Sequence, residues 1–217
     1  MKSISVAIST RGRPGVLKHS VSEWKRHYPN INIIIVEDNG PTPRGIAATK
    51  NICLDLLMKS GSQHCFLSDD DIYPTTNRGV YRYIRSPYNH LCFSFDRDYK
   101  GKRISHDVYI KKVIRGHNIF NSPCGCLLYV NRKVLTSGIR FDENFGIWGG
   151  EHKDYSIQIH KIGLTPYPFI DVKGSDKHFY SHDKNGTAEG SVPEHIRVSE
   201  IRRNSVYYNK KWNLLNR

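Results

Sequence analysis

Long apolar runs are missing from this chain of 217 residues. No segment approaches the ~20 apolar residues that a helix needs to cross a bilayer. The apolar stretch at residues 4–8 is too short for the core of a secretory signal peptide. We therefore expect a protein that is neither secreted nor membrane-spanning.

Paired cysteines are also missing. The chain has five cysteines, an odd number, and only Cys124 and Cys126 lie close together in the sequence. This spacing fits neither a disulfide framework nor a zinc site, so the cysteines are interpreted as buried or free thiols in a reducing compartment. We expect a cytoplasmic protein.

Acidic residues are the minority among the charged ones. The 33 lysines and arginines outnumber the 20 aspartates and glutamates, which gives a formal net charge of +13. Such a field favours nucleic acid, an anionic membrane surface or nucleotide-type substrates. The basic residues are spread along the chain in short groups, and for any single group a solubilising surface is the ordinary interpretation.

Strand-like and helix-like patterns alternate in the first third of the chain. The pattern predicts strands at 4–9, 31–37 and 64–68 and helices at 16–27 and 45–59. A strand–helix–strand alternation of this length predicts parallel strands in an open, doubly wound sheet, with ligands at the carboxyl ends of the strands. The length and the 38% apolar content suit one α/β domain.

The remainder is less regular. It predicts helices at 75–85, 132–137 and 150–163 and strands at 91–95, 126–130, 168–172 and 177–182, with a polar, β-leaning stretch at 103–115. Ser191 and Glu194 have the spacing of a capping box, which predicts a basic helix from there through about Tyr208.

Unusual polar residues follow each of the three parallel strands. They are 10–13 after the first, 37–40 after the second, and Asp69, Asp70 and Asp71 after the third. Three adjacent carboxylates repel one another, and such a cluster usually persists because a cation neutralises it. Carboxylates, water and substrate phosphates are the ligands of Mg²⁺ or Mn²⁺. The sequence therefore predicts a metal-bound phosphate here, with a solvated acidic turn as the alternative.

The order of these motifs resembles a known enzyme family. Residues 4–11, 34–40, 44–51 and 66–71 resemble successive blocks of family 2 glycosyltransferases of the GT-A fold. Residues 141–154 resemble the Trp-Gly-Gly-Glu motif of β-1,4-galactosyltransferases, and 180–185 resemble the histidine segment that follows it. The resemblance covers about residues 3–71 and 124–185. It implies a GT-A-type, Rossmann-like open mixed sheet flanked by helices.

The resemblance also implies an activity and a division of the chain. The activity is metal-dependent transfer of a hexose or pentose from a nucleotide sugar, UDP-linked by family precedent, to an acceptor hydroxyl with inversion. The single domain, residues 1–217, would comprise a nucleotide-sugar-binding half at 1–120, an acceptor and metal-histidine half at 121–190 and a basic C-terminal helix at 191–217. No obligate protein partner is implied.

Asp69 and Asp71 fill the Asp-x-Asp pattern that holds the divalent cation, Mn²⁺ or Mg²⁺, in this family. By resemblance, Asp71 would bind the metal directly, and Asp69 would meet the ribose or the metal's waters. His182 would be the third protein ligand, with His178 as the alternative. A lone histidine is otherwise more often a surface or core residue.

The candidate donor-binding residues lie at the strand ends or on the second helix. They are Thr10, Arg11, Arg13, Asp38, Lys50, Asn51 and Asp69, with Trp148 as a platform for donor or acceptor. A carboxylate suits ribose hydroxyls, and arginine suits base edges or phosphate. Ordinary alternatives stay open: an exposed turn for Arg13, a solvated lysine for Lys50 and a core tryptophan for Trp148.

The candidate general base lies at the start of a helix. Glu151 follows two glycines that let the backbone approach a sugar, and a carboxylate there can take a proton from an attacking hydroxyl. The next position, where relatives often have an aspartate, is His152, and the next acid is Asp154. The base therefore stays open among Glu151, His152 and Asp154.

The acceptor is suggested only by charge. A net charge of +13 favours an acceptor with many phosphates, so we predict a hydroxymethylated pyrimidine in duplex DNA, as for viral enzymes of similar build, in which case the location would be the host cytoplasm. Exposed tyrosines would then line the approach, with Tyr81, Tyr83, Tyr109 and the pair 207–208 as candidates. The alternatives are a glycan, lipid or protein acceptor in surface polysaccharide synthesis, and a non-catalytic nucleic-acid-binding relic, suggested by His152.

Overall fold

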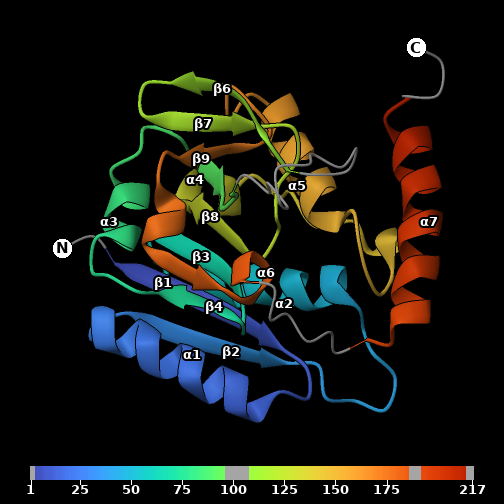
Figure 1. Cartoon of the computed structure of the whole chain (residues 1–217), viewed down its shortest axis with the longest axis horizontal. Helices are drawn as coiled ribbons and strands as arrows, with labels where there is room; N and C mark the ends of the chain where they lie inside the picture. Colours follow the sequence, from blue (N-terminus) through green and yellow to red (C-terminus); the bar gives the residue numbers. More distant parts are fainter. Residues whose placement is uncertain (1–2, 96–107, 186–191, 214–217) are drawn as a thin grey trace.

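The computed structural model describes residues 3–95, 108–185 and 192–213. Its centre is a five-stranded sheet in the order β2-β1-β3-β8-β5 (Figure 1). The strands are β1 (Ile4–Thr10), β2 (Asn32–Glu37), β3 (His64–Asp69), β5 (His90–Cys92) and β8 (Leu127–Asn131). The first three are parallel, and β8 runs antiparallel between β3 and β5. The predicted α/β fold with an open mixed sheet is confirmed.

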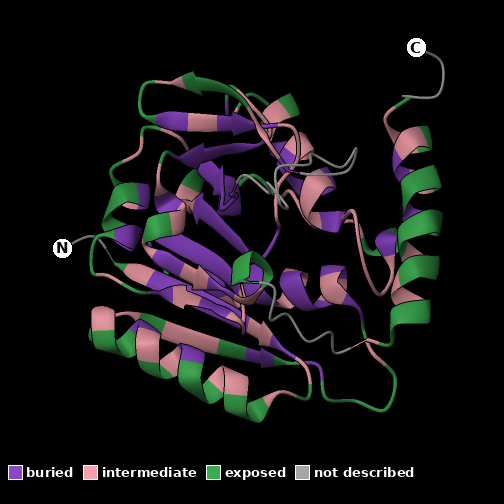
Figure 2. Cartoon of the chain, viewed as in Figure 1, coloured by how far each residue is buried: buried purple, intermediate pink, exposed green. Residues whose placement is uncertain are grey.

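Helices cover both faces of this sheet because its strands bury alternate side chains on opposite sides. Val6 and Ile8 of β1 belong to one core with Trp24 of α1 (Pro14–His27). Ala7 belongs to the second core, with Leu54 of α2 (Ile46–Lys59). Both cores are apolar, so the strand centres are buried while the outward sides of α1 and of α7 (Glu194–Lys211) stay exposed (Figure 2).

The remaining elements complete the domain. Two small sheets pair β4 (Ile72–Pro74) with β10 (Phe179–Ser181), and β6 (Ile110–Ile114) with β7 (His117–Phe120) and β9 (Ile170–Val172). The helices are α3 (Gly79–Ile84), α4 (Arg132–Leu135), η1 (Glu143–Phe145), α5 (Glu151–Lys161), η2 (Ser175–Lys177), α6 (His182–Asn185) and α7 (Glu194–Lys211). Within the described part of the chain, no helix combines the length and apolar character required to span a membrane.

Most predicted elements are present with shifted ends, and one prediction was wrong in detail. The helix expected at 75–85 is only α3, and before it Thr75 still donates its N–H to the His178 carbonyl oxygen, next to the pairing of β4 with β10. The predicted capping box involves Ser191, which lies outside the described residues, as do 103–107 of the β-leaning stretch. The helix predicted after it is present as α7, with Pro193 at its N-cap.

Candidate functional site

A cleft of about 450 Å³ opens at the carboxyl ends of the parallel strands. One wall, which we call the strand-end side, is formed by the residues that follow β1, β2 and β3: Thr10, Arg11, Arg13, Asp38, Asp69 and Asp71. The opposite wall, the loop side, is formed by residues 147–152 at the start of α5. This is where a parallel sheet is expected to bind its ligand.

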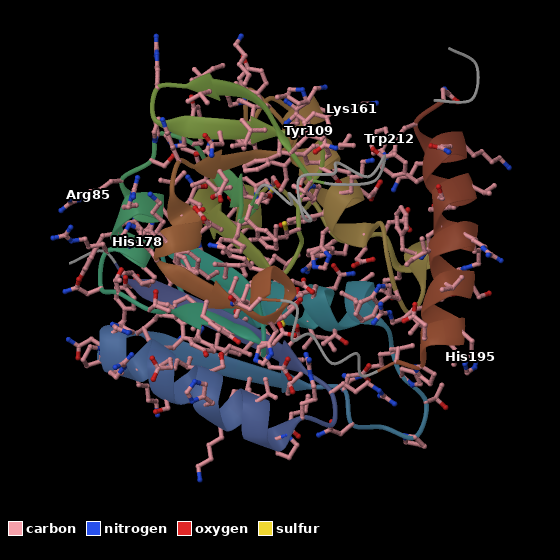
Figure 3. All side chains as sticks on the ribbon, in the orientation of Figure 1. Arg85, Tyr109, Lys161, His178, His195 and Trp212 are labelled. Atoms are coloured by element: carbon pink, nitrogen blue, oxygen red, sulfur yellow. The ribbon has the colours of Figure 1, made fainter. Side chains whose placement is uncertain are left out.

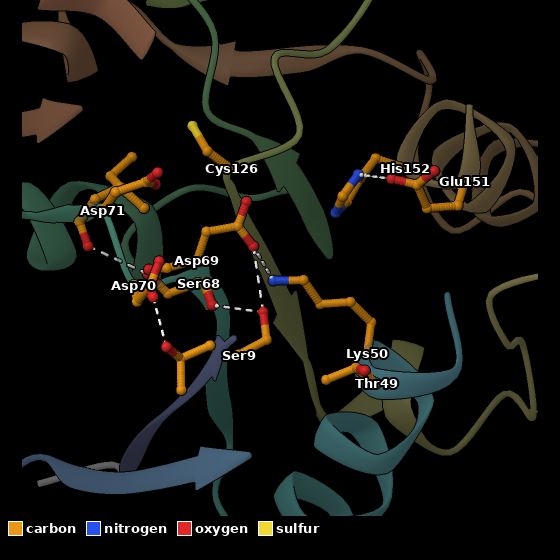
Figure 4. A network of polar contacts seen from close by, with 12 residues as sticks. Ser9, Thr49, Lys50, Ser68, Asp69, Asp70, Asp71, Cys126, Glu151 and His152 are labelled. Carbon is orange, nitrogen blue, oxygen red and sulfur yellow. Dashed lines mark hydrogen bonds and ion pairs between the residues drawn. The ribbon is translucent and has the colours of Figure 1, made fainter. Parts of the chain in front are cut away.

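The aspartate triplet is held on the strand-end side by two basic side chains. Lys50 is fully buried, and its Nζ lies 2.6 Å from Asp69 Oδ1, which also accepts a bond from Ser9 (Figure 4). Arg13 pairs with Asp70, and its Nη1 donates to Asp71 Oδ2 at 3.0 Å. Three carboxylates thus face two cations.

The cluster is short of positive charge. Burial and the neighbouring Asp69 carboxylate together raise the pKa of Asp71 to about 6, even though Arg13 opposes both effects. Burial also raises the pKa of Asp70, against a 2.5 Å hydrogen bond from Thr10 and the charge of Arg13. A further cation beside Asp69 and Asp71 would relieve this repulsion.

The donor chemistry fits a hard divalent cation with few protein ligands. Among residues 3–95, 108–185 and 192–213, no three histidine, cysteine, aspartate or glutamate side chains are grouped to hold a metal. Mg²⁺ is commonly held by only one or two carboxylates together with water and substrate phosphates. Asp69 and Asp71, which both line the cleft, match that arrangement.

Of the two predicted histidine ligands, His182 lies next to Asp71, whereas His178 is not brought together with these aspartates. His182 begins α6, its backbone N–H donates to the Asp71 carbonyl oxygen at 3.1 Å, and its ring packs against Tyr180. His178 is bonded to Thr76 and Arg82 beside α3, away from the cleft (Figure 3). Neither histidine lines the cleft, whereas Asp183 does.

The predicted nucleotide-binding residues differ in whether they line the cleft and in which hydrogen bonds they already make within the protein. Both Asp38 carboxylate oxygens accept the backbone N–H of Arg44 at 3.1 Å, and Arg11 donates to the Asp38 carbonyl oxygen. Asp38 therefore lines the cleft and also fixes the turn before α2. Asn51 is outside the cleft, because its side chain bonds both backbone polar groups of Phe141 and joins α2 to that segment.

The three candidate bases have different surroundings in the structure. Glu151 is 3% exposed and pairs with His152 Nδ1 at 2.7 Å, and both residues line the cleft (Figure 4). His152 Nε2 is buried and has no hydrogen-bond partner among the described residues. Asp154 is outside the cleft, fully buried and bonded at 3.0 Å to Lys211 and Trp212, so it anchors the end of α7.

The segment that carries α7 reaches the cleft, which the sequence did not indicate. Val192 and Arg197 line it, and the Arg197 guanidinium lies 5.2 Å from the centre of the Trp148 ring, which is also at the cleft surface. The basic composition of this helix suggested contacts with DNA. Two of its cations, Arg203 and Lys211, instead form ion pairs within the molecule.

Two of the tyrosines proposed to approach DNA are unavailable for stacking. Tyr83 is fully buried and Tyr208 is 8% exposed, because both pack into the interior. Tyr81 is 39% exposed, but it lies on α3, and it does not line the cleft.

Comparison with known proteins gives one similar sequence and a similar fold. No protein-family model matches the chain. The chain is 26% identical over 167 residues to an uncharacterized glycosyltransferase of Acanthamoeba polyphaga mimivirus, covering 70% of this chain and 58% of that one. The chain thus spans little more than half the length of this relative.

Among solved structures, the chain is similar to a β-1,4-galactosyltransferase 7 mutant from Drosophila in complex with manganese, UDP-Gal and xylobiose. The similarity covers 90% of this chain and 78% of that one, with 12% identity and a TM-score of 0.58. At this identity, the similarity is one of fold. The chain therefore has the mixed α/β fold, an open sheet flanked by helices, of a GT-A glycosyltransferase.

Proposed function

We propose that the protein is a glycosyltransferase that moves a sugar from a nucleotide-sugar donor to an acceptor hydroxyl. One observation carries the proposal: an aspartate cluster short of positive charge faces a buried glutamate across a cleft at the carboxyl ends of parallel strands. The glycosyltransferase fold and the mimivirus relative support it.

The strand-end side would bind the donor. Asp38 and Thr10 offer oxygens to the nucleoside, and Arg11 offers a guanidinium suited to a base edge or a phosphate. Asp69 and Asp71 would hold a divalent cation, Mn²⁺ or Mg²⁺. When bound, this ion would neutralise the charge that develops on the diphosphate as the glycosidic bond breaks.

The loop side would bind the acceptor and take its proton. Glu151 would receive the proton of the attacking hydroxyl, and His152, bonded to it at 2.7 Å, would hold the carboxylate in position. The acceptor oxygen forms a bond to the anomeric carbon, the bond from that carbon to the diphosphate breaks, and the nucleoside diphosphate leaves. A single displacement of this kind inverts the anomeric centre.

The acceptor remains a hydroxyl of unspecified origin, for which we retain duplex DNA with hydroxymethylated pyrimidines as the first candidate. The net charge of +13 supports it. A surface glycan, lipid or protein is the rival. Labelled nucleotide sugar offered with either hydroxymethylated duplex DNA or a lipid-glycan extract separates them, since label only in the extract contradicts the DNA acceptor.

The activity is tested by donor turnover. We expect release of nucleoside diphosphate from at least one of a panel of UDP- and GDP-sugars with millimolar Mn²⁺. Asp71→Asn should reduce it at least about a hundredfold, because stabilisation by the cation is worth several kcal/mol. The matched control, Asp55→Asn, changes a half-exposed aspartate outside the cleft and should stay within twofold. No turnover with any donor would contradict the proposal.

A further inference from the structure

The segment 145–150, which we call the Trp148 loop, carries Trp148 and leads into Glu151 at the start of α5. None of its residues belongs to a strand, and Gly149 and Gly150 both have φ of +94°. The carbonyl groups of such a backbone do not take part in the hydrogen bonds of a regular helix or sheet. Their hydrogen-bond donors must therefore come from other parts of the chain.

Those hydrogen bonds come from α7. Asn204 is 2% exposed, and its Nδ2 lies 2.6, 2.7 and 2.8 Å from the carbonyl oxygens of Phe145, Trp148 and Gly149. Three carbonyl oxygens thus meet at one side-chain NH₂ group. Only a donor can occupy that point, because an acceptor would face three oxygens of the same partial charge.

A second contact of α7 holds the middle of the same loop. Glu200 Oε2 accepts the backbone N–H of Ile147 at 2.8 Å, and it also pairs with Arg203, which donates to the Phe145 carbonyl oxygen at 2.9 Å. Gly146 leaves no room beside these groups, since a Cβ there would lie 2.3 Å from Arg203 Nη2.

The loop is also blocked on the side that faces α2. A Cβ on Gly45, the N-cap of α2, would lie 2.3 Å from the carbonyl oxygen of Gly146. The Trp148 loop therefore lies between the start of α2 and the inner face of α7, and it cannot shift far in either direction without breaking one of these contacts.

We propose that Asn204 is a positioning residue that sets the Trp148 loop, and with it Trp148 and Glu151, for binding of the acceptor. The C-terminal helix, which lies outside the family resemblance, is then part of the acceptor side of the site. The expected change in acceptor KM rests on the proposed function, whereas the expected change in hydrogen exchange of the Trp148 loop does not.

Asn204→Leu tests the inference by removing the amide from a side chain of similar size. Hydrogen exchange of the amides in 145–150 should accelerate at least about tenfold, because three buried carbonyl groups lose their donor. The acceptor KM should rise by about the same factor, while hydrolysis of the nucleotide sugar without acceptor stays within twofold. A loss of folding alone would lower both activities together.

The controls separate the possible outcomes. Arg202→Ala changes an exposed residue of the same helix and should alter neither exchange nor KM. Glu200→Ala removes the acceptor for Ile147 and the ion pair with Arg203 but leaves Asn204 in place, and it gives a second, milder variant if Asn204→Leu does not fold. Unchanged loop exchange, or an unchanged acceptor KM, in a folded variant overturns the inference. Absence of donor turnover in the unaltered protein contradicts the proposed function instead. Hydrogen exchange of the Trp148 loop in Asn204→Leu then tests the structural role of Asn204 by itself.

Discussion

The two sides of the cleft are held by different kinds of interaction. On the strand-end side, β1 pairs with β2 and β3 in a continuous parallel ladder that brings Thr10 beside Glu37 and Ser9 beside Asp69. On the loop side, the Trp148 loop depends on side chains of α7 some 55 to 59 residues further along the chain. Backbone pairing tolerates substitution, whereas a loop held by side chains can be released by one change.

The largest effect is expected where the two sides touch. Gly45 has φ of 94° and ψ of 160°, which only glycine adopts readily, and its missing Cβ makes room for Gly146. Gly45→Ala should lower the free energy of unfolding by about 3 kcal/mol or more, measured by urea denaturation. Gly15→Ala, at a position with open space in α1, should be neutral or stabilising by up to about 1 kcal/mol. Equal effects of the two substitutions would contradict the contact.

The second largest effect is expected from the buried ion pair of Lys50 and Asp69 on the strand-end side. Burial lowers the pKa of Lys50, but Asp69, Cys53 and Cys126 together raise it by more, so the ammonium stays charged in the interior. Lys50→Met should lower the free energy of unfolding by about 2–3 kcal/mol, less than for a fully buried pair because the Asp69 side chain is 31% exposed. Lys59→Met, at the exposed end of the same helix, should change it by less than about 0.5 kcal/mol. An equally small change for Lys50→Met would show that the pair of Lys50 and Asp69 adds nothing to the free energy of unfolding.

The smallest effect concerns the scaffold beneath the loop side and depends on pH. His90 is fully buried under α5, where it bonds Ser156, and burial lowers its pKa from 6.5 to about 4. The unfolded chain then binds a proton that the native state does not, so this group makes stability rise between pH 4 and 6.5. Burial raises the pKa of Asp171 from 3.8 to about 7, so this group makes stability fall between about pH 4 and 7.

The two groups therefore oppose each other, each with a slope of at most about 1.4 kcal/mol per pH unit. Relative to the unaltered protein, His90→Gln should shift the slope of unfolding free energy against pH downward, and Asp171→Asn should shift it upward. Urea denaturation at several values between pH 4.5 and 6.5 measures both. Slopes that shift in the same direction would contradict these assignments.

The sequence predicted the strand-end side better than the loop side for a physical reason. Thr10, Asp38 and Asp71 follow short apolar strands, and parallel pairing brings the ends of such strands together. The hydrogen bonds of Asn204, and the pairing of Asp154 with Lys211, depend on how a distant helix packs, and no local pattern reports that.

The two candidate histidine ligands show what a motif leaves open. The segment after the Trp-Gly-Gly-Glu motif suggested His182 or His178 as a metal ligand, and the structure distinguishes them, because His182 lies next to Asp71 and His178 does not. Their places depend on the pairing of β10 with β4, a strand that the sequence pattern did not predict. His178 lies beside α3 because β10 pairs with β4. A family motif identifies a segment, whereas the direction of each side chain depends on the neighbouring strand.

The position of β8 constrains how the molecule can be divided. This strand comes from the second half of the chain, yet it lies between β3 and β5, which both come from the first. Cutting the polypeptide near residue 120 would leave the strand that bears the aspartates with a bare edge and an unfilled core. Two separately produced fragments should therefore stay insoluble or unfolded alone and recover structure only when mixed, so the two sides of the cleft belong to one folding unit.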